Sequence, residues 1–248
     1  MESVVAPWRE RFQIALLSQP GAGPARARNY GAKIARGRFL AFTDDDCRPA
    51  PEWLAQLWAT LSLAPEAVAG GRTVNALDRN VFAVASQALI GYLYDYFNRE
   101  PSKSWFLATN NFALSAGTFR SLGGFDTSFP TAAAEDRDLC SRLRDAGRGM
   151  VFAPQAVVFH LHPLNLASFW TQHFEYGRGA RRYWRAKLRR SGEGLRVEPL
   201  RFYSRMLSWP FRQREIHQPR LVVALLILSQ IANAAGYFWE ALAARRSP

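Results

Sequence analysis

The sequence predicts an α/β domain that is followed by a basic helical segment and then by a hydrophobic helix. Over residues 1–165, short apolar runs alternate with stretches of helical periodicity, which is the pattern of a sheet flanked by helices. Basic side chains outnumber acidic ones over residues 166–220, and residues 221–243 form a largely apolar stretch. We therefore expect three parts with these boundaries.

The composition is that of a folded protein. Of the 248 residues, 48% are hydrophobic and 21% are charged, which is enough apolar material for a sizeable core. Cys47 and Cys140 do not form a CxxC pair, so neither a disulfide framework nor a zinc site is indicated, and a reducing compartment is favoured. The N-terminal residues lack the basic start and apolar core of a signal peptide.

The net charge of +12 is concentrated in one segment. Residues 1–175 contain 17 Lys and Arg against 16 Asp and Glu, whereas residues 176–220 contain 13 against three. The next 19 residues, 221–239, carry no charge, and this length is close to the ~20 residues with which a helix crosses a bilayer. A basic tract beside such a helix predicts association with membrane lipids, here at the cytoplasmic face. The alternative is a buried helix that packs on the domain.

The charge also raises the possibility of nucleic-acid binding. No recognition motif accompanies the basic tract, and its aromatic residues occur at helical apolar positions. A nucleic-acid partner is therefore not expected.

Apolar runs and turn residues define the elements of the first half of the chain. Glycines and prolines between residues 19 and 24 mark a loop, Gly37 ends the helix that follows, and the prolines at 49 and 51 are tolerated in the first turn of the next helix. Strands are expected at 13–17 and 38–42, a strand plus a turn at 67–71 and 72–74, and helices at 25–35, 49–63 and 80–98.

The second half continues the alternation before it becomes helical. Glycines close a short helix near residue 123, and Leu139 and Leu143 share one face of an amphipathic helix that ends at Gly147. From Ser168 onward the pattern is helical and basic. Strands are expected at 106–115, 150–152 and 157–160, and helices at 118–126 and 135–146.

Three adjacent carboxylates follow the strand predicted at 38–42. Asp44, Asp45 and Asp46 repel one another unless a positive group lies among them. In open α/β sheets, ligand-binding groups collect beyond the C-terminal ends of strands, and Asp-x-Asp spacing lets two carboxylates reach one hard cation such as Mg²⁺ or Mn²⁺. The alternative is a polar turn that caps the next helix.

Three further polar groups are candidates for a site. Glu135 and Asp136 begin a helix where a carboxylate could accept a proton from a hydroxyl, although the helix dipole alone favours acids there. His160 and His162 alternate along a strand, so both rings share one face and could bind Mn²⁺ or serve the structure only. The Asn pair at 110–111 could bind ligand hydroxyls or backbone groups.

Taken in order, these motifs resemble those of the inverting family 2 glycosyltransferases, which have the GT-A fold. Residues 27–37, Ala-Arg-Asn-Tyr-Gly-Ala-Lys-Ile-Ala-Arg-Gly, are similar to that family's ARN-G-A-x-x-A-x-G helix, and Phe-Thr-Asp-Asp-Asp at 42–46 is similar to its Asp-x-Asp signature. Gly-Gly-Phe-Asp at 123–126, followed by Glu-Asp at 135–136, resembles its GGFD…ED segment, and His160 falls where many members carry a histidine. The likeness covers roughly residues 13–185 and implies a mixed, Rossmann-like sheet flanked by helices.

The resemblance implies transfer of a sugar from a nucleoside-diphosphate sugar to a hydroxyl of a glycan or lipid-linked acceptor, as in polysaccharide biosynthesis. Asp46, with Asp44 nearby and His160, would hold Mg²⁺ or Mn²⁺, which stabilises the charge of the departing diphosphate. Asp136 would be the general base, with Glu135 supporting it or contacting the acceptor. Substrate contacts are expected from Arg28, Asn29, Asp45, Asn110, Asn111, Arg178 and Arg181.

Two departures from the family pattern shape the expected activity. Processive members carry Gln-x-x-Arg-Trp, whereas residues 172–176 read Gln-His-Phe-Glu-Tyr, so a single transfer is expected, with Arg178 or Arg181 meeting phosphate. The strand–turn–helix–strand unit that binds the nucleotide base in the family is not recognisable, so the chain resembles an N-terminally truncated domain without its first ~40 residues. We therefore expect weak binding of sugar nucleotides. The alternative function is a catalytically impaired fragment that docks on a membrane or a partner.

Overall fold

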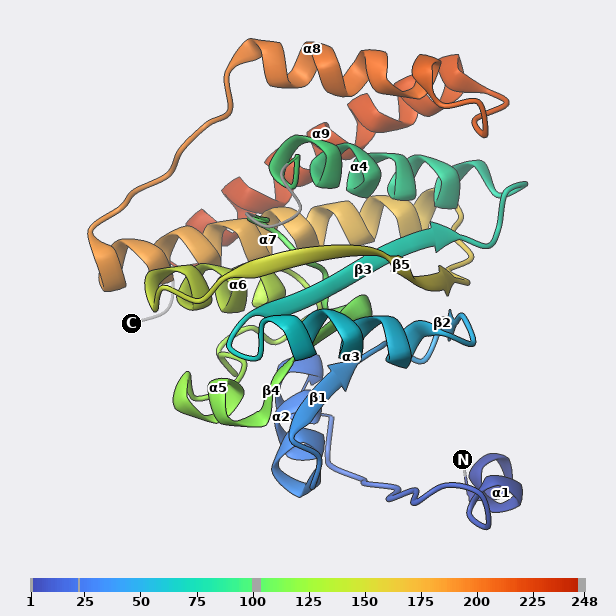
Figure 1. Ribbon diagram of the computed structural model, residues 1–248. Helices are drawn as coiled ribbons and strands as arrows, with labels where there is room; N and C mark the ends of the chain where they lie inside the picture. The colour runs from blue at the N-terminus through green and yellow to red at the C-terminus, as the bar shows by residue number, and fades with distance from the viewer. Residues whose placement is uncertain (1, 22, 100–103, 245–248) are drawn as a thin grey trace.

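The computed structural model describes residues 2–21, 23–99 and 104–244, and its centre is a five-stranded mixed sheet (Figure 1). The strands are β1 (Phe39–Phe42), β2 (Cys47–Pro49), β3 (Val68–Asn75), β4 (Phe112–Ser115) and β5 (Met150–His160), in the order β1-β4-β3-β5-β2. β3 and β5 pair in parallel, and the other neighbouring pairs are antiparallel. The mixed α/β sheet expected from the sequence is confirmed.

Helices cover both faces of this sheet. The elements are α2 (Gly23–Ile34), α3 (Trp53–Leu63), α5 (Ala116–Ser121) and α6 (Glu135–Asp145). Side chains alternate along a strand, so Phe112 and Leu114 of β4 face a core that includes α2 and α6, where Leu139 is fully buried. Ala113, between them, faces α3 and Leu57 on the opposite side. This alternation fixes both layers around the sheet.

A second core joins α4 to the C-terminal helices. These elements are α4 (Val81–Phe97), α7 (Leu166–Ser191), α8 (Leu200–Ser208) and α9 (Pro219–Ala243), which stack on one side of the sheet in Figure 1. Two further elements are short 3-10 helices: η3 (Thr109–Asn111) directly precedes β4, and η4 (Trp209–Arg212) follows α8. Tyr92 of α4 and Phe202 of α8 pack edge to face, and the Tyr92 hydroxyl donates to the Phe202 carbonyl at 2.7 Å. The C-terminal helices therefore share buried side chains with the domain that precedes them.

α7 and α9 approach each other at two glycines. A Cβ atom at Gly177 would lie 1.9 Å from the Asn233 carbonyl oxygen, and a Cβ atom at Gly236 would lie 1.9 Å from the Phe174 carbonyl oxygen. Any other residue at either position would push the two backbones apart.

An ion-pair network adds to the contact between α7 and α9. Glu240 of α9 is only 9% exposed, and its carboxylate accepts hydrogen bonds from Arg178 at 2.9 Å and from Arg182 at 2.8 Å. By length and composition α9 could cross a membrane, but in this structure it lies alongside α7. Among the described residues, it is the only helix that meets both criteria.

The long strand β5 replaces two short strands expected at 150–152 and 157–160. Its pairing with β3 shifts between Gly71 and Arg72, because Gly71 pairs with Ala153 whereas Arg72 pairs with Val157. Residues 154–156 have no partner on β3, and they include Pro154, which has no N–H to donate to a ladder. The prediction of two separate strands was wrong, because the chain resumes the same ladder after the irregularity.

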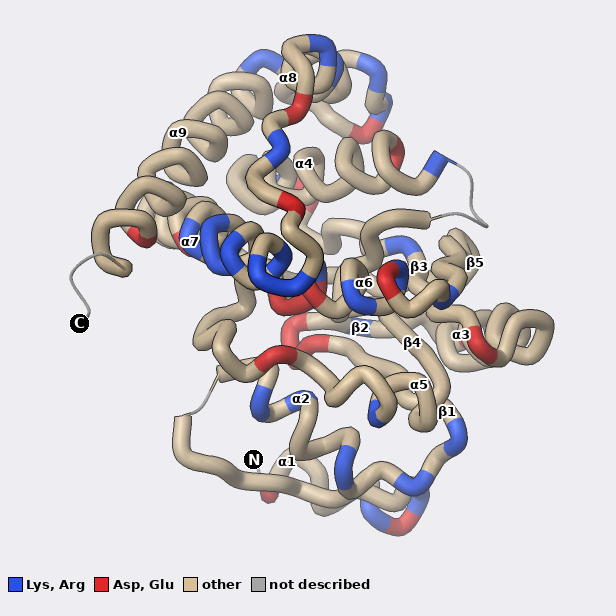
Figure 2. The backbone as a smooth tube through the Cα atoms, turned by 90° about the vertical axis from the view of Figure 1, so that its left-hand side faces the viewer, with Lys and Arg blue, Asp and Glu red and all other residues tan. Residues whose placement is uncertain are grey.

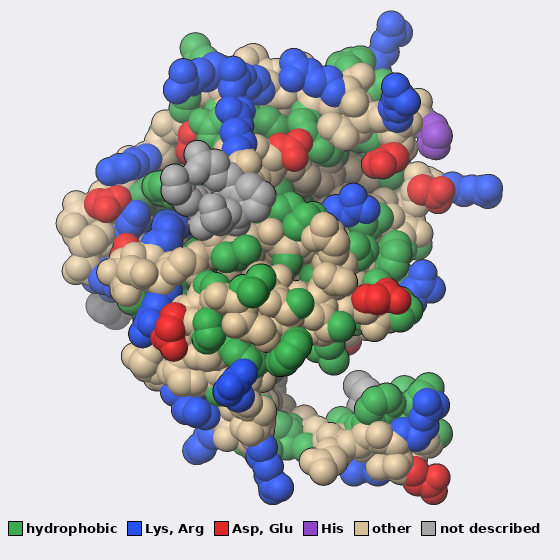
Figure 3. All heavy atoms as spheres, viewed as in Figure 1, with side chains coloured by type: hydrophobic (Ala, Val, Ile, Leu, Met, Phe, Trp, Pro, Cys, Tyr) green, Lys and Arg blue, Asp and Glu red, His purple; other side chains and the backbone are tan. Residues whose placement is uncertain are grey.

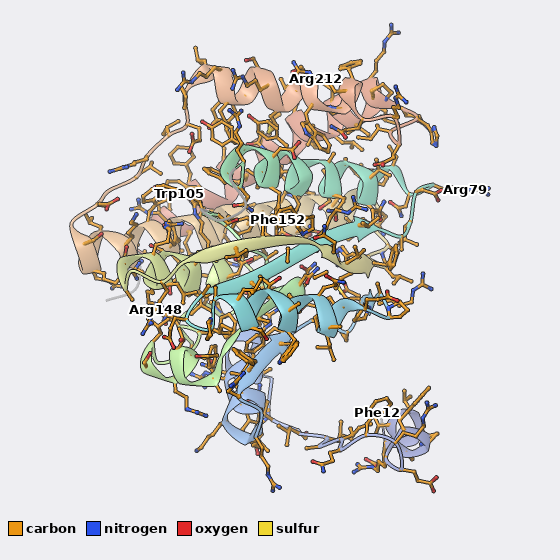
Figure 4. All side chains as sticks on the ribbon, viewed as in Figure 1. Phe12, Arg79, Trp105, Arg148, Phe152 and Arg212 are labelled. Carbon is orange, nitrogen blue, oxygen red and sulfur yellow. The ribbon has the colours of Figure 1, made fainter. Side chains whose placement is uncertain are left out.

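The strand expected at residues 13–17 is not formed. These residues have no regular secondary structure, and Leu16 is exposed. The segment leads from α1 (Glu2–Val5) and η1 (Ala6–Trp8) across open space to the body of the molecule, and Phe12 lies at its far end (Figure 4). A strand requires a neighbour for its N–H and C=O groups, and no described strand lies beside this segment.

Candidate active site

A single guanidinium holds the acidic loop after β1 to the start of α6. Arg28 of α2 donates from Nη2 to Asp44 Oδ1 at 2.7 Å and from Nη1 to Glu135 Oε1 at 2.6 Å. Glu135 is 3% exposed, so the ion pair is shielded from water. Burial opposes the charge on Arg28, but the two carboxylates outweigh it and raise the guanidinium pKa. The positive group that adjacent aspartates require comes from α2.

Asp46 lies against two histidines at the end of β5. Asp46 Oδ2 is 3.1 Å from His160 Nε2 and 3.0 Å from His162 Nδ1, and the two rings are stacked with centroids 5.2 Å apart. The short strand β2 produces this contact, because Cys47 pairs with His160 across the sheet edge. One carboxylate oxygen and two imidazole nitrogens lie within 4.8 Å of one another, which is a donor set that suits Mn²⁺ and similar divalent ions.

Gln172 of α7 orients the second histidine. Its amide nitrogen donates to Ser86 Oγ and to the Tyr176 hydroxyl, both at 2.9 Å, which leaves its oxygen to accept from His162 Nε2 at 3.0 Å. In neutral His162 this arrangement leaves a lone pair on Nδ1 that points at Asp46 Oδ2. A positive charge beside these two electron-rich atoms, either a proton or a bound divalent cation, would stabilise this arrangement.

Tyr176 connects the histidine cluster to the acids of α6. Its hydroxyl accepts from Gln172, and burial raises the pKa of that hydroxyl to about 12, with further contributions from the negative charges of Asp136, Glu135 and Asp44. Tyr176 therefore bonds the residue that holds His162 and also feels the charges of the α6 acids.

Asp136 has the electrostatics of a base that works near neutral pH. Withdrawal from solvent raises the pKa of its carboxyl to about 7, and the neighbouring Glu135 charge adds to this rise, while Arg28 opposes it. The Asp136 Oδ1 atom accepts a hydrogen bond from the Arg137 backbone N–H at 2.7 Å. A carboxylate with such a pKa can both accept and release a proton at neutral pH.

The chain enters α6 through a strained residue. Ala134, directly before Glu135, has φ 71°, a left-handed conformation that a non-glycine residue adopts at a cost. The preceding residue packs tightly on α7, since a Cβ atom at Gly179 would lie 2.3 Å from the Ala133 carbonyl oxygen. Close packing therefore fixes the direction in which Glu135 and Asp136 leave the loop.

Two asparagines predicted to contact substrate have their amides bonded within the protein. Asn29 donates to the Phe125 carbonyl and accepts from the Phe125 N–H, each at 2.8 Å, which joins the helix α2 to the Gly-Gly-Phe-Asp turn. Asn111 is fully buried and donates to the carbonyls of Arg72 and Ala156, so it bridges the irregular part of the β3–β5 ladder. Its oxygen accepts from Trp53 Nε1 at 2.8 Å. These contacts support the fold.

The remaining predicted residues lie in different surroundings. Asn110 is half-buried and accepts from Thr73 Oγ1 at 3.1 Å, and its amide hydrogens bond no other described residue, so they could meet a ligand. Asp45 is exposed and forms no hydrogen bond with a described residue. Arg178 bonds Glu175 and Glu240, and Arg181 donates to the Tyr237 hydroxyl at 3.1 Å, so both arginines hold α9 in this structure.

Sequence reasoning missed three residues of this region. His162 was considered with His160 but was not included in the predicted metal set, and no role was predicted for Gln172 or Tyr176. The alternation of the two histidines was a sufficient signal for His162. Gln172 and Tyr176 gave no such signal, because their importance depends on how α7 crosses the end of β5.

Comparisons with known proteins point to one family. The model of the family described as "Glycosyl transferase family 2" matches residues 2–123. The pre-mycofactocin glycosyltransferase of Mycobacterium tuberculosis is 30% identical over 173 residues, which cover 67% of this chain and 36% of that protein. The glucosyl-dolichyl phosphate glucuronosyltransferase of Haloferax volcanii is 26% identical over 148 residues, covering 56% of this chain and 47% of that protein. The chain thus spans between about a third and a half of the length of these relatives.

The fold of the chain is also similar to that of a solved structure. The crystal structure of GalNAc-T7 with UDP, GalNAc and Mn²⁺ aligns with 91% of this chain and 44% of that chain, at a TM-score of 0.49 and 17% sequence identity. At this TM-score the likeness supports neither a substrate nor a metal for this chain.

Proposed function

The chain belongs to glycosyltransferase family 2, and on that premise we propose that it transfers a sugar from a nucleoside-diphosphate sugar to an acceptor hydroxyl with inversion at the anomeric carbon. The observation that carries the proposal is the double contact of Arg28 with Asp44 and Glu135. It brings the acidic loop after β1 to the start of α6, where the proposed base Asp136 lies. Residues 107 positions apart in the sequence thus meet at one place.

Asp136 is the proposed general base. Its raised pKa of about 7 lets the carboxylate take the proton from an acceptor hydroxyl as that oxygen attacks the sugar. Glu135 cannot share this role, because it is buried and bonded to Arg28. Glu135 instead holds the first turn of α6 in place, and its negative charge contributes to the raised pKa of Asp136.

Asp46, His160 and His162 are the proposed ligands of a divalent cation, with Asp44 nearby. The cation, when bound, would neutralise negative charge on the diphosphate leaving group. Gln172 holds the His162 ring so that Nδ1 faces Asp46. This set differs in two ways from the ligand set implied by the family resemblance. His162 is added to it, and Asp44 forms an ion pair with Arg28, so it is not counted as a ligand.

The donor and acceptor are proposed only as classes. Asp45 and Asn110 have polar atoms free for substrate, whereas Asn29, Asn111, Arg178 and Arg181 are bonded within the protein. One relative is named for transfer to a glucosyl-dolichyl phosphate, and α9 is apolar enough to enter a membrane. We therefore propose a glycan or lipid-linked acceptor at the cytoplasmic face of a membrane.

The proposal is tested by supplying the purified chain with a panel of nucleoside-diphosphate sugars, Mn²⁺ and membrane lipid extract. Release of nucleoside diphosphate with transfer of the sugar is expected, and Asp136→Asn should abolish it. Asp78→Asn is the matched control, because Asp78 is an exposed aspartate on the loop before α4. If no donor is turned over, or if Asp136→Asn retains full activity, the proposed reaction is wrong. Absence of turnover with retained membrane binding would favour a docking protein.

A further inference from the structure

The outer side of α9 is apolar along its whole length. Its exposed residues recur every three or four positions, which places them on one face of the helix. This face, the α9 stripe, is about 30 Å long and carries no polar side chain between its first and last members. The members of the α9 stripe are Leu221, Ala224, Ile227, Ile231, Ala234, Ala235, Phe238, Trp239 and Leu242.

Two polar side chains of α9, those of Ser229 and Glu240, are buried on the side toward the protein. Ser229 is fully buried and donates to the Leu226 carbonyl at 2.7 Å, and the buried Glu240 carboxylate bonds to Arg178 and Arg182. A helix on the surface of a water-soluble domain has the reverse arrangement, with its polar face outward. The α9 stripe therefore matches an apolar medium rather than water.

α9 cannot take a spanning position without leaving the domain. The glycines at 177 and 236 and the Glu240 network keep α9 against α7, and α7 carries the exposed charges Arg185 and Arg189. Crossing a bilayer as a packed pair would carry these arginines into hydrocarbon. While α9 remains docked on α7, its axis lies along the surface of the protein, so only its outer side can contact lipid.

Arginines border the α9 stripe. Arg220 is the second residue of α9, Arg212 and Arg214 lie on the segment that leads into it, and Arg201 and Arg205 lie on α8. All five are exposed, and none forms an ion pair with a described carboxylate. Figure 2 shows α9 as a nearly uncharged tube between the basic positions of α8 and α7, and Figure 3 shows basic side chains gathered over α8. Positive charge beside an apolar strip is complementary to anionic lipid head groups.

We infer that the α9 stripe and the arginines of α8 form a membrane-docking face that binds an anionic lipid surface with α9 in the plane of the interface. The bilayer surface is the occupant, and the helix does not cross it. This inference is independent of the transfer reaction, since none of its residues lies in the candidate active site. It gives the chain a defined orientation, with α8 and α9 toward the lipid.

Vesicle co-sedimentation of the full chain tests the inference. Binding is expected to phosphatidylcholine vesicles that contain phosphatidylglycerol and to be much weaker without it. Ile227→Ser/Ile231→Ser should reduce the apparent affinity by at least about tenfold, because two apolar side chains lose their burial in lipid. Arg201→Gln/Arg205→Gln should reduce it by about fivefold for each arginine. Leu54→Ser/Trp58→Ser, two exposed apolar residues of α3, is the matched control and should bind normally.

The orientation of α9 is tested by fluorescence depth. A nitrobenzoxadiazole label on Ala224→Cys, Ile231→Cys or Phe238→Cys, each in a Cys47→Ser background, should be quenched from similar depths if α9 lies in the plane of the interface. A label at 231 that is much deeper than the other two would indicate a spanning helix and overturn the inference. So would binding that is unchanged in Ile227→Ser/Ile231→Ser. A lipid-free dimer that this variant converts to a monomer would assign the face to a second copy instead, which also overturns it.

Discussion

The Nη1 atom of Arg28 lies 2.6 Å from Oε1 of Glu135, and this contact joins α2 to the beginning of α6. The Arg28 side chain is 13% exposed and the Glu135 side chain is 4% exposed. An ion pair so shielded is costly to break, because either partner alone would remain as a buried charge.

Arg28→Met should therefore destabilise the protein by about 3 kcal/mol, as a buried carboxylate loses its partner. Urea unfolding measures the free energy of unfolding. Arg26→Met is the matched control, because Arg26 lies on the same helix but is exposed and unpaired among the described residues. The double variant Arg28→Met/Glu135→Gln should recover much of the loss. Equal losses for Arg28→Met and Arg26→Met would contradict the prediction.

Asp136→Asn should remove activity and stabilise the fold at the same time. The pKa of the Asp136 carboxyl is about 7 in the folded protein against an ordinary value of 3.8. Below about pH 4 the Asp136 carboxyl is protonated in both the folded and the unfolded chain. Between about pH 4 and 7 it is ionised in the unfolded chain but still protonated in the folded one, so the free energy of unfolding of the native protein falls as the pH rises. Asp136→Asn has no ionisable group at this position, so its stability does not fall in this way.

Thermal unfolding measured at about pH 8 should therefore show a higher melting temperature for Asp136→Asn than for the native chain, with little difference near pH 4. The kcat/KM of the native protein should rise as the pH increases through about 7, because only the ionised carboxylate acts as a base. Asp78→Asn should change neither property. A lower melting temperature for Asp136→Asn at high pH would mean that its carboxylate stabilises the fold.

Mn²⁺ should bind at Asp46, and the two histidines should strengthen the binding. In isothermal titration with manganese chloride, His162→Ala should weaken the affinity at least about tenfold, and Gln172→Leu should weaken it by a comparable factor, because the ring loses its orientation. His217→Ala replaces an exposed histidine outside the cluster and is the control. Binding that survives Asp46→Asn unchanged would place the cation elsewhere.

Gly236→Ala should destabilise the packing of α9 on α7. The added methyl group would overlap the Phe174 carbonyl oxygen, so the helices must separate, at a cost of roughly 2 kcal/mol. Gly31→Ala, in α2, is the control, because nothing lies within 4 Å of its position and the change should be neutral or slightly stabilising. Equal melting temperatures for the two variants would show that α7 and α9 can separate enough to admit the methyl group without loss of stability.

The two neighbouring asparagines should respond differently to substitution. Asn111→Ala removes the hydrogen bonds that bridge the irregular ladder and should lower the free energy of unfolding by about 2 kcal/mol. Asn110→Ala should leave stability nearly unchanged and should weaken donor binding, measured as a higher KM. A loss of stability from Asn110→Ala as large as that from Asn111→Ala would mean that both serve the fold.

Local patterns in the sequence were sufficient to predict most of the helices and the position of the acids. The periodicity and end signals of α4 and α6 are contained within a few residues, as is the strand that precedes Asp44. Which strands pair with one another in the sheet was harder to predict. Residues 13–17 have the apolar character of a strand but no partner, and β2 is so short that only its ladder with β5 identifies it.

The roles of individual site residues also depend on distant contacts. Arg28 was expected to meet substrate, yet its two partners come from the loop after β1 and from α6, which no local pattern brings together. Asn29 similarly bonds a backbone 96 residues away. His162 could have been included from its alternation with His160, whereas Gln172 required knowledge of where α7 crosses the sheet edge.

The bare backbone of Gly179 touches the Ala133 carbonyl with no side chain between them. A displacement of α7 along or about its axis must therefore shift the residues just before α6, and with them the carboxylates of Glu135 and Asp136. The same helix carries the glycine through which α9 is attached. The proposed lipid-facing helix α9 and the proposed base Asp136 are thus both connected to α7, so a change in the position of one would be transmitted through α7 to the other.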